Sequence, residues 1–135
     1  MSLKKLLIVD DEENMRHMLE AMLSRHNYIL DSAKDGEEAS KLISKKRFDF
    51  ILCDIRMPNL NGLEFLQQNN DKLMDTTVIM MSAYGSIDLA LEAMKAGAYD
   101  FISKPFKADE VLLTLKKAEE REQLKKENLI LRKEL

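Results

Sequence analysis

The sequence predicts an α/β fold: a five-stranded parallel sheet, doubly wound, followed by a carboxyl-terminal helical extension. Two observations support this fold class. Short apolar runs alternate along the chain with segments whose apolar residues recur at helical spacing. Strands that alternate with helices are joined by crossover connections and therefore lie parallel. With 135 residues, of which 45% are hydrophobic, the chain can build one hydrophobic core without disulfides or structural metals.

The strands are expected where the apolar runs are rich in β-formers, at residues 6–9, 28–32, 48–53, 77–81 and 99–103. The segments between them carry helix-boundary signals. Asp35 is placed to cap a helix with Glu38 at its third position, and Ser86 is placed to cap another. Gly97 follows the last turn of that second helix, where glycine commonly ends a helix.

Composition excludes several classes of protein. Cys53 is the only cysteine and lies in an apolar run, so disulfide and zinc frameworks are excluded. The amino-terminal apolar stretch is too short for a signal peptide or a membrane span, which favours a cytoplasmic protein with no membrane contact. A net charge of -3 gives no broad basic surface, so direct nucleic-acid contact by this chain is not expected.

Reactive side chains occur at the carboxyl ends of four of the five predicted strands. These ends gather around one crevice in an open parallel sheet. The residues at these ends are Asp10, Asp11, Asp54, Ser82 and Lys104. Converging carboxylates stay ionised together only if a hard cation or a lysine compensates them. An oxygen-lined site of this kind suits magnesium, which leaves room for a phosphate.

Each of these residues also has a plainer explanation. Asp10 and Asp11 could cap a helix and complement its dipole. Asp54 could be a turn residue, Ser82 a strand-end hydroxyl and Lys104 a solvated cation. Coincidence would have to place all of them at the ends of the right strands, so the joint pattern favours a functional site.

From Leu3 to about Glu119 the chain resembles the receiver domains of two-component response regulators, which have a flavodoxin-like fold. The segments that carry the resemblance are Val9–Glu12, Asp54–Pro58 with Gly62, Met81–Ala83 and Lys104–Phe106. The resemblance implies that a sensor histidine kinase donates a phosphoryl group to Asp54. It also implies that magnesium is bound by Asp11 directly, by Asp10 partly through water, by Asp54 and by the backbone carbonyl of Arg56.

The same resemblance implies roles around the phosphoryl group. Ser82 and Lys104 would contact it and, with Asp54, carry the chemistry. Ser82 and Phe101 would form the switch, with Phe101 changing rotamer. Many relatives carry tyrosine where this chain has Phe101, so here packing alone would sense the switch. Arg56 and Tyr84 each stand two residues past a key group, and from that position alone they are expected to flank the opening. Ordinary loop surface is the alternative for both.

The segments 82–86 and 93–101 resemble one branch of that family, the NtrC-like regulators that control transcription. In that branch an AAA+ ATPase and a DNA-binding domain follow the receiver. No Gly-x-x-x-x-Gly-Lys-Ser/Thr loop occurs in this sequence, so the chain is expected to be the regulatory part alone. We expect a receiver domain over residues 1–119 and a linker helix over 120–135.

Three other functions fit the sequence less well. A pseudo-receiver that only binds a partner would be favoured if an acidic residue of the site were missing, and none is. A phosphatase of the haloacid-dehalogenase type needs a second acid two residues after the nucleophile, where this chain has Arg56. A flavin- or nucleotide-binding domain needs a glycine-rich loop after the first strand, and Asp10 and Asp11 stand there instead.

The linker helix predicts a homodimer. Four residues follow spacings of four, three and four, as coiled-coil core positions do: Leu124, Asn128, Leu131 and Leu135. An asparagine at a core position favours two strands in one register. The seam covers only about two heptads, and Leu129 and Ile130 lie outside it. A solvated helix, or one that docks on a missing domain, therefore remains an alternative.

Overall fold

The computed structural model describes residues 3–83 and 87–134. The chain divides into two compact units, residues 1–105 and residues 106–135. The first unit holds a five-stranded sheet in the order β2-β1-β3-β4-β5, and every neighbouring pair is parallel. The strands are β1 (Lys4–Val9), β2 (Tyr28–Ala33), β3 (Phe50–Asp54), β4 (Thr77–Ser82) and β5 (Asp100–Ser103). The predicted fold class is confirmed.

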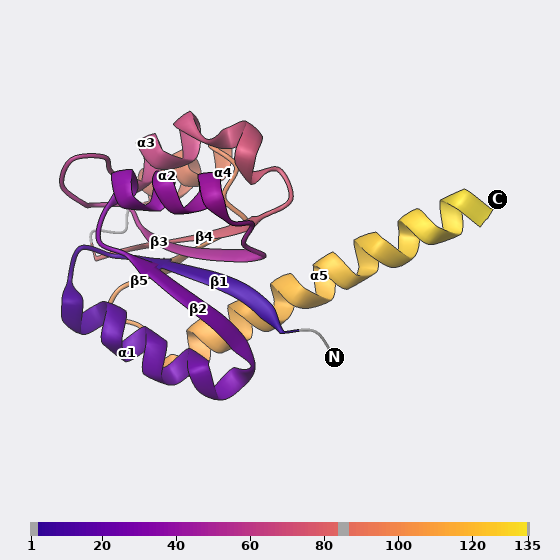
Figure 1. Ribbon diagram of the computed structural model, residues 1–135, viewed down its shortest axis with the longest axis horizontal. Coiled ribbons are helices and arrows are strands. Elements are labelled where there is room, and N and C mark those ends of the chain that lie inside the picture. The colour runs from indigo at the N-terminus through magenta and orange to yellow at the C-terminus, as the bar shows by residue number, and fades with distance from the viewer. Residues whose placement is uncertain (1–2, 84–86, 135) are drawn as a thin grey trace. The chain divides into compact units, whose positions relative to one another are not determined.

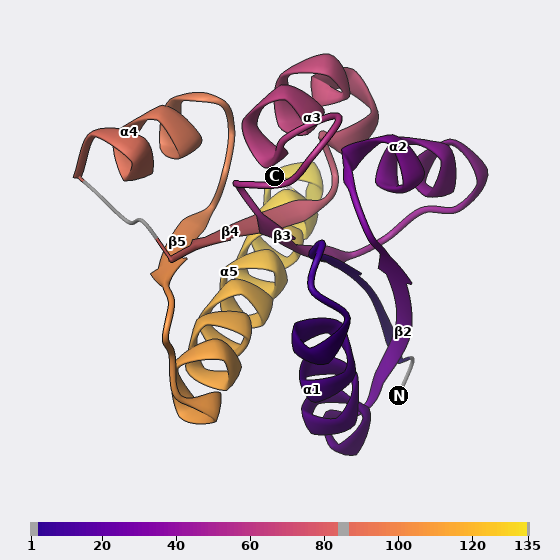
Figure 2. The ribbon, with the colours of Figure 1, turned by 90° about the vertical axis from the view of Figure 1, so that its left-hand side faces the viewer.

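Helices cover both faces of this sheet. In the first unit they are α1 (Glu13–Leu23), α2 (Gly36–Lys45), α3 (Gly62–Gln68) and α4 (Ile87–Lys95). Two 3-10 segments, Ser24–His26 and Asn70–Leu73, continue α1 and α3. Figures 1 and 2 show α1 on one face of the sheet and α2, α3 and α4 on the other. The winding reverses at β1, which pairs with β2 on one side and β3 on the other. Crevices open at such reversal points, beyond the carboxyl ends of the strands.

The core is centred on β3 and β4. Every residue of these two strands is buried, as expected for central strands of a parallel sheet covered on both faces. Phe65 and Leu66 of α3 and Ala39 of α2 belong to the same buried set. Because β3 lies at the middle of the sheet, the residues at its carboxyl end are flanked by β1 and β4.

The strand boundaries differ slightly from the prediction. The third strand begins at Phe50 rather than residue 48, although Phe48 is still buried in the preceding loop. Burial of Phe48 made it look like a strand residue, since an apolar run does not distinguish a buried loop position from a strand position. At the other end, Asp54 and Ser82 are the last residues of β3 and β4. Their side chains are therefore fixed by the sheet itself.

Two predicted helix boundaries are confirmed. An Asp35 side-chain oxygen accepts from the Glu38 backbone N–H at 2.9 Å, so Asp35 caps α2. Gly97 has φ of 110°, and it ends α4 with two bonds, from its own N–H to the Met94 carbonyl and from the Ala98 N–H to the Ala93 carbonyl. This is the Schellman arrangement, in which glycine accepts the left-handed conformation without strain. The predicted cap Ser86 lies outside the described residues.

One apolar stripe of α4 faces outward. Ile87, Leu91 and Met94 recur at helical spacing but are all exposed. Ala93 is buried and Leu89 packs on the core, so these two residues lie on the covered side. Helical spacing predicts the helix correctly, but here two stripes are apolar and spacing alone does not say which one is covered.

The second unit is dominated by one helix, α5 (Ala108–Glu134). It is continuous through residues 119 and 120, where the sequence places a boundary between receiver and linker. Its buried residues, Val111, Leu115 and Ala118, all lie in its first half. Among the helices of the described residues, none combines the length and apolar character that crossing a bilayer requires.

Candidate functional site

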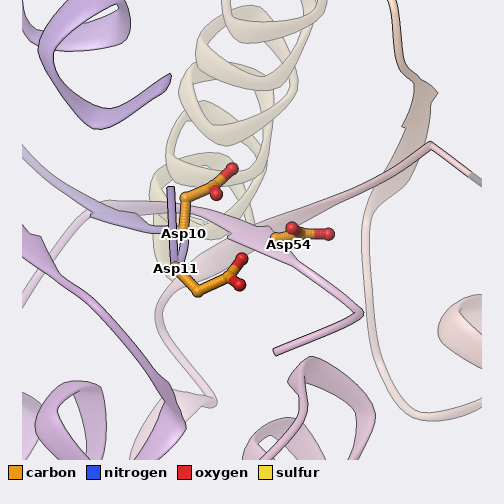
Figure 3. A group of neighbouring side chains, drawn as sticks. All are labelled: Asp10, Asp11 and Asp54. Atoms are coloured by element: carbon orange, nitrogen blue, oxygen red, sulfur yellow. The ribbon is translucent and has the colours of Figure 1, made fainter. Parts of the chain in front are cut away.

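Three acidic side chains meet at the carboxyl edge of the sheet. Asp10 and Asp11 follow β1, and Asp54 ends β3, the neighbouring strand. Figure 3 shows Asp10 and Asp11 next to each other and Asp54 beside them. Each offers one oxygen that lies within 4.8 Å of the others. The sequence predicts that these residues come together, and the geometry agrees.

A lysine from β5's end compensates two of these acids. The Lys104 Nζ lies 2.7 Å from an Asp10 oxygen and 3.3 Å from an Asp54 oxygen. All three side chains are nearly inaccessible, with exposed fractions of 8% for Lys104, 0% for Asp10 and 8% for Asp54. Charges buried to this degree persist only when they are paired. Lys104 is therefore the internal counter-ion of the two buried carboxylates.

Burial and the neighbouring charges shift the pKa values of Asp54 and Lys104. Burial raises the pKa of Asp54 above its ordinary value, the Lys104 charge opposes that rise, and the Asp10 charge adds to it. Burial also opposes the charge on Lys104, but its hydrogen bond to Asp10 and the two carboxylate charges outweigh burial and raise the Lys104 pKa. The lysine is thus charged near neutrality, while Asp54 gives up its proton less readily than an ordinary aspartate.

Asp10 is held by its own neighbourhood. Its Oδ1 accepts from the Glu12 backbone N–H at 2.9 Å, and its carbonyl oxygen accepts from the Arg16 guanidinium at 2.8 Å. Helix α1 has Glu12 as its cap residue and no side-chain capping bond. Asp10 thus contacts the start of α1 as well as Lys104, whereas the Asp11 side chain is exposed at the rim of the site.

The loop after β3 folds back against Asp54. The Arg56 N–H donates to Asp54 Oδ1 at 3.3 Å, and the Gly62 N–H donates to the Ile55 carbonyl at 2.8 Å. A Cβ on Gly62 would lie 2.5 Å from the Asp54 carbonyl oxygen, so no larger residue fits there without a shift. Glycine at this position allows the loop to return close to the acceptor carboxylate.

The remaining predicted residues lie on the strands beside Asp54. Ser82 is fully buried at the end of β4, and its neighbour Met81 pairs in register with Asp54. Phe101 is half-buried on β5, where it pairs with Met80. Arg56 is exposed at the loop, and Tyr84 lies outside the described residues.

Two interactions beside the site were not predicted from the sequence. The Arg16 contact with the Asp10 backbone has no clear sequence signal. Asp35 and Asn59 are joined by a side-chain hydrogen bond of 3.1 Å that ties the loop after β3 to the start of α2. In the sequence, Asn59 follows Pro58, a pattern typical of turns. In the structure its φ is 67°, a left-handed value that asparagine tolerates.

The residues fit a divalent cation. Three carboxylates supply hard oxygen donors within reach of one ion, and two of them are already buried. Oxygen donors of this kind are typical of magnesium sites that leave coordination positions open to a phosphate. Lys104 accounts for only part of the negative charge, so a cation would complete the balance.

Comparison with known proteins agrees with this geometry. A family model described as the response regulator receiver domain matches residues 6–116. The response regulator protein PilR of Pseudomonas aeruginosa is 44% identical over 105 residues, which are 78% of this chain and 24% of that protein. The chemotaxis protein CheY of Listeria monocytogenes is 43% identical over 115 residues, which are 84% of this chain and 97% of that protein.

A solved structure shows the same fold. NtrX from Brucella abortus in complex with ADP has a TM-score of 0.85 and 34% identity over 93% of this chain and 29% of that chain. The chain spans about a quarter of the length of PilR, AtoC of Escherichia coli and ZraR of Klebsiella oxytoca. These relatives confirm the predicted likeness to NtrC-like regulators. The family match covers most of the chain, and the chain belongs to the response regulator receiver domain family.

Proposed function

We propose that this receiver domain accepts a phosphoryl group on Asp54 from a sensor histidine kinase, with magnesium as cofactor, and thereby switches a transcription-regulating output. The observation that carries the proposal is the buried Lys104, which bridges Asp10 and Asp54 beside a third carboxylate. Burying these charges costs desolvation free energy, and a buried ion pair often adds little stability. A purely structural role therefore does not require them.

The transfer makes one bond and breaks one bond. An Asp54 carboxylate oxygen forms a bond to phosphorus while the bond between phosphorus and the donor's histidine nitrogen breaks, and the electron pair of that bond stays on the nitrogen. In-line approach and neutralisation of the phosphoryl oxygens are the main requirements of such a transfer. Lys104 can pair with one phosphoryl oxygen from its place beside Asp54. The domain would catalyse only its own phosphorylation and dephosphorylation, so we class it as a regulatory phospho-acceptor and not as an enzyme acting on other molecules.

Asp10, Asp11, Asp54 and the backbone carbonyl of Arg56 would hold the magnesium ion. When bound, the ion supplies positive charge at the phosphoryl oxygens. Asp11, exposed at the rim, is the one of these carboxylates that does not depend on Lys104 for its position. Asp11→Ala should therefore weaken magnesium binding while the fold persists. An unchanged calorimetric magnesium titration would remove Asp11 from the site.

Switching would follow from the new phosphoryl oxygens. They can accept a hydrogen bond from Ser82, at the end of the strand next to β3, and Phe101 on β5 can then turn into a different packing. Phe101 is only half-buried, which leaves it a choice of packings. The phosphoryl group must favour one packing by its contacts, because a ligand shifts an equilibrium only through differential affinity.

Incubation with a small phosphodonor such as acetyl phosphate tests this function. The intact chain should gain the mass of one phosphoryl group in magnesium and not in a chelator. Asp54→Asn is nearly isosteric but lacks the nucleophile, so it should gain nothing. If this variant is phosphorylated at the parent rate, Asp54 is not the acceptor. If the parent is never phosphorylated, a pseudo-receiver that only binds partners becomes the better description.

The output would belong to a longer protein in the cytoplasm. The NtrC-like arrangement is the model for it, with a receiver over residues 1–119 and a linker helix over 120–135. An AAA+ ATPase and a DNA-binding domain would follow. The chain's net charge of -3 supports leaving nucleic-acid contact to those domains.

We also propose that the linker helix forms a homodimer seam from Leu124, Asn128, Leu131 and Leu135. Leu124 and Leu131 are 65% and 59% exposed in α5, and a partner helix would cover them. Leu135 lies outside the described residues. Leu124→Asp with Leu131→Asp should shift sedimentation toward monomer without unfolding the domain. A parent chain that sediments as a monomer at high concentration, with and without phosphorylation, contradicts the seam.

A further inference from the structure

The loop between β3 and α3, residues 55–61, is tied to the start of α2. The Asn59 Nδ2 donates to Asp35 Oδ2 at 3.1 Å, and the Gly36 N–H donates to the Leu60 carbonyl at 3.1 Å. A Cβ on Gly36 would lie 2.5 Å from the Leu60 carbonyl oxygen, so the two main chains approach as closely as glycine permits. The loop is thus held from outside by an element that does not belong to the acidic site.

Asp35 divides its two oxygens between two tasks. Oδ1 accepts from the Glu38 N–H at 2.9 Å and caps α2, whereas Oδ2 accepts from Asn59. The residue is only 5% exposed. The Glu38 N–H, with help from Asn59 and Lys34, lowers the pKa of Asp35 despite its burial, so both oxygens remain acceptors at neutral pH. Helix capping explains Oδ1 and leaves Oδ2 to the loop.

The far end of the same loop touches the acceptor. Arg56 donates its N–H to Asp54 Oδ1, three residues before Asn59. Asn59 itself has a left-handed φ of 67°, which asparagine adopts more readily than most residues. The hydrogen bond to Asp35 holds its side chain in one orientation. A change at Asp35 therefore reaches Arg56 and Asp54 through only a short stretch of main chain.

We propose that Asp35 is a positioning residue of the phosphorylation site, which acts through Asn59 to hold the main chain of Arg56 against Asp54 and so strengthens divalent-cation binding. The inference rests on the proposed function, in which Asp54 and the Arg56 carbonyl bind the cation. Partners that orient metal ligands from outside typically contribute on the order of tenfold or more to affinity.

The hydrogen bond can be broken and then rebuilt. In Asn59→Asp two carboxylates would meet, so the bond is lost. In Asp35→Asn the capping oxygen remains, and the Asn59 amide can turn so that its oxygen accepts from the new NH2, so one bond is kept. The double variant D35N/N59D reverses donor and acceptor and restores one bond at the parent's net charge. Calorimetric magnesium titration of the unphosphorylated chain should show about tenfold weaker binding in N59D and near-parent binding in D35N and in the double variant.

Thr76→Val is the matched control for stability. It removes the hydrogen bond from Thr76 Oγ1 to the Phe48 carbonyl, 2.7 Å long and at the opposite edge of the sheet. It should lower the unfolding free energy and leave magnesium affinity unchanged. Weaker magnesium binding in this control would show that the titration responds to general loss of stability and would overturn the assignment.

The other outcomes separate positioning from its alternatives. Parent-like binding in N59D overturns the proposal, and so does a double variant that fails to recover. Stronger binding in N59D alone would show that charge near the site matters and not the hydrogen bond, which again overturns it. If the parent chain neither binds magnesium nor gains phosphate, the proposed function fails first and this inference falls with it.

Discussion

Polar side chains have different surroundings at the two ends of the strands, which are called here the amino edge and the carboxyl edge of the sheet. At the amino edge, where the strands begin, side chains pair with nearby main chain close to water. Asp49 accepts from the Lys5 N–H at 2.9 Å and from exposed Arg47 at 3.2 Å, and Thr76 donates to the Phe48 carbonyl. At the carboxyl edge, Lys104 reaches Asp10 and Asp54 in a space that is almost closed to solvent.

The polar contacts at the amino edge serve stability, whereas the buried charges at the carboxyl edge serve function. Contacts at the amino edge satisfy polar groups at little desolvation cost. At the carboxyl edge, three buried charges must be desolvated, and the cost of desolvation can exceed the gain from pairing. A fold selected for stability alone has no need of these charges. Their presence therefore points to chemistry at this edge, and mutations at the two edges should differ in kind as well as in size.

The largest effect is expected from removing the counter-ion. Lys104→Met keeps most of the stem but leaves two buried carboxylates uncompensated, and breaking a buried pair in this way costs about 3 kcal/mol of unfolding free energy. Urea denaturation in a chelating buffer measures this loss. Magnesium should restore part of it, because a cation takes over the compensation. Parent-like stability in chelator would remove the contrast between the edges.

A smaller effect of opposite sign is expected at Asp54. Burial raises its pKa in the folded chain, so the folded state holds the proton to a higher pH than the unfolded state, and stability falls as pH rises through the raised pKa. Asp54→Asn carries no charge and escapes this loss. Without metal, the variant should be more stable than the parent near neutrality, and the difference should shrink in acid.

Denaturation of parent and variant from about pH 4 to about pH 8 follows this difference through the carboxyl titration range. A variant that is less stable than the parent near neutrality would mean that the ion pair with Lys104 stabilises the fold more than burial of Asp54 destabilises it. The carboxyl edge would then resemble the amino edge in its energetics.

The smallest effect is expected at the amino edge. Thr76→Val removes one hydrogen bond and should cost about 1 kcal/mol of unfolding free energy. Phosphate uptake from a small donor, followed by intact mass, should proceed at the parent rate. A slower uptake would show that the two edges are coupled and that the division drawn between them is too sharp.

The sequence predicted the fold and the carboxyl-edge residues for the same reason. Strand periodicity locates the ends of strands, and the topology of a parallel sheet brings those ends together. Asp10, Asp54 and Lys104 could thus be grouped without knowing any distance. Individual boundaries were less accurate, as with Phe48, because apolar character reports burial and not backbone conformation.

Contacts that depend on how two loops meet could not be predicted. The hydrogen bond between Asp35 and Asn59 joins residues that are separated in the sequence by α2 and β3. Each has a sufficient local explanation, as a helix cap and as a turn residue, and neither explanation suggests the other. The outward stripe of α4 is a similar case, since the coverage of a helix depends on its neighbours and not on its own spacing.

Cys53 gives this chain a built-in reporter of local opening. It is the only cysteine, it is fully buried on β3, and its Sγ lies 3.4 Å from the Asp54 carbonyl oxygen. Burial, with the charges of Asp54 and Asp10, raises the thiol's pKa well above its ordinary value, so the reactive thiolate is scarce in the closed fold. A thiol reagent in water can react only when the strand opens. The labelling rate of the unmodified protein thus measures how often the acceptor's own strand becomes exposed, one residue from the place where the phosphoryl group would be attached.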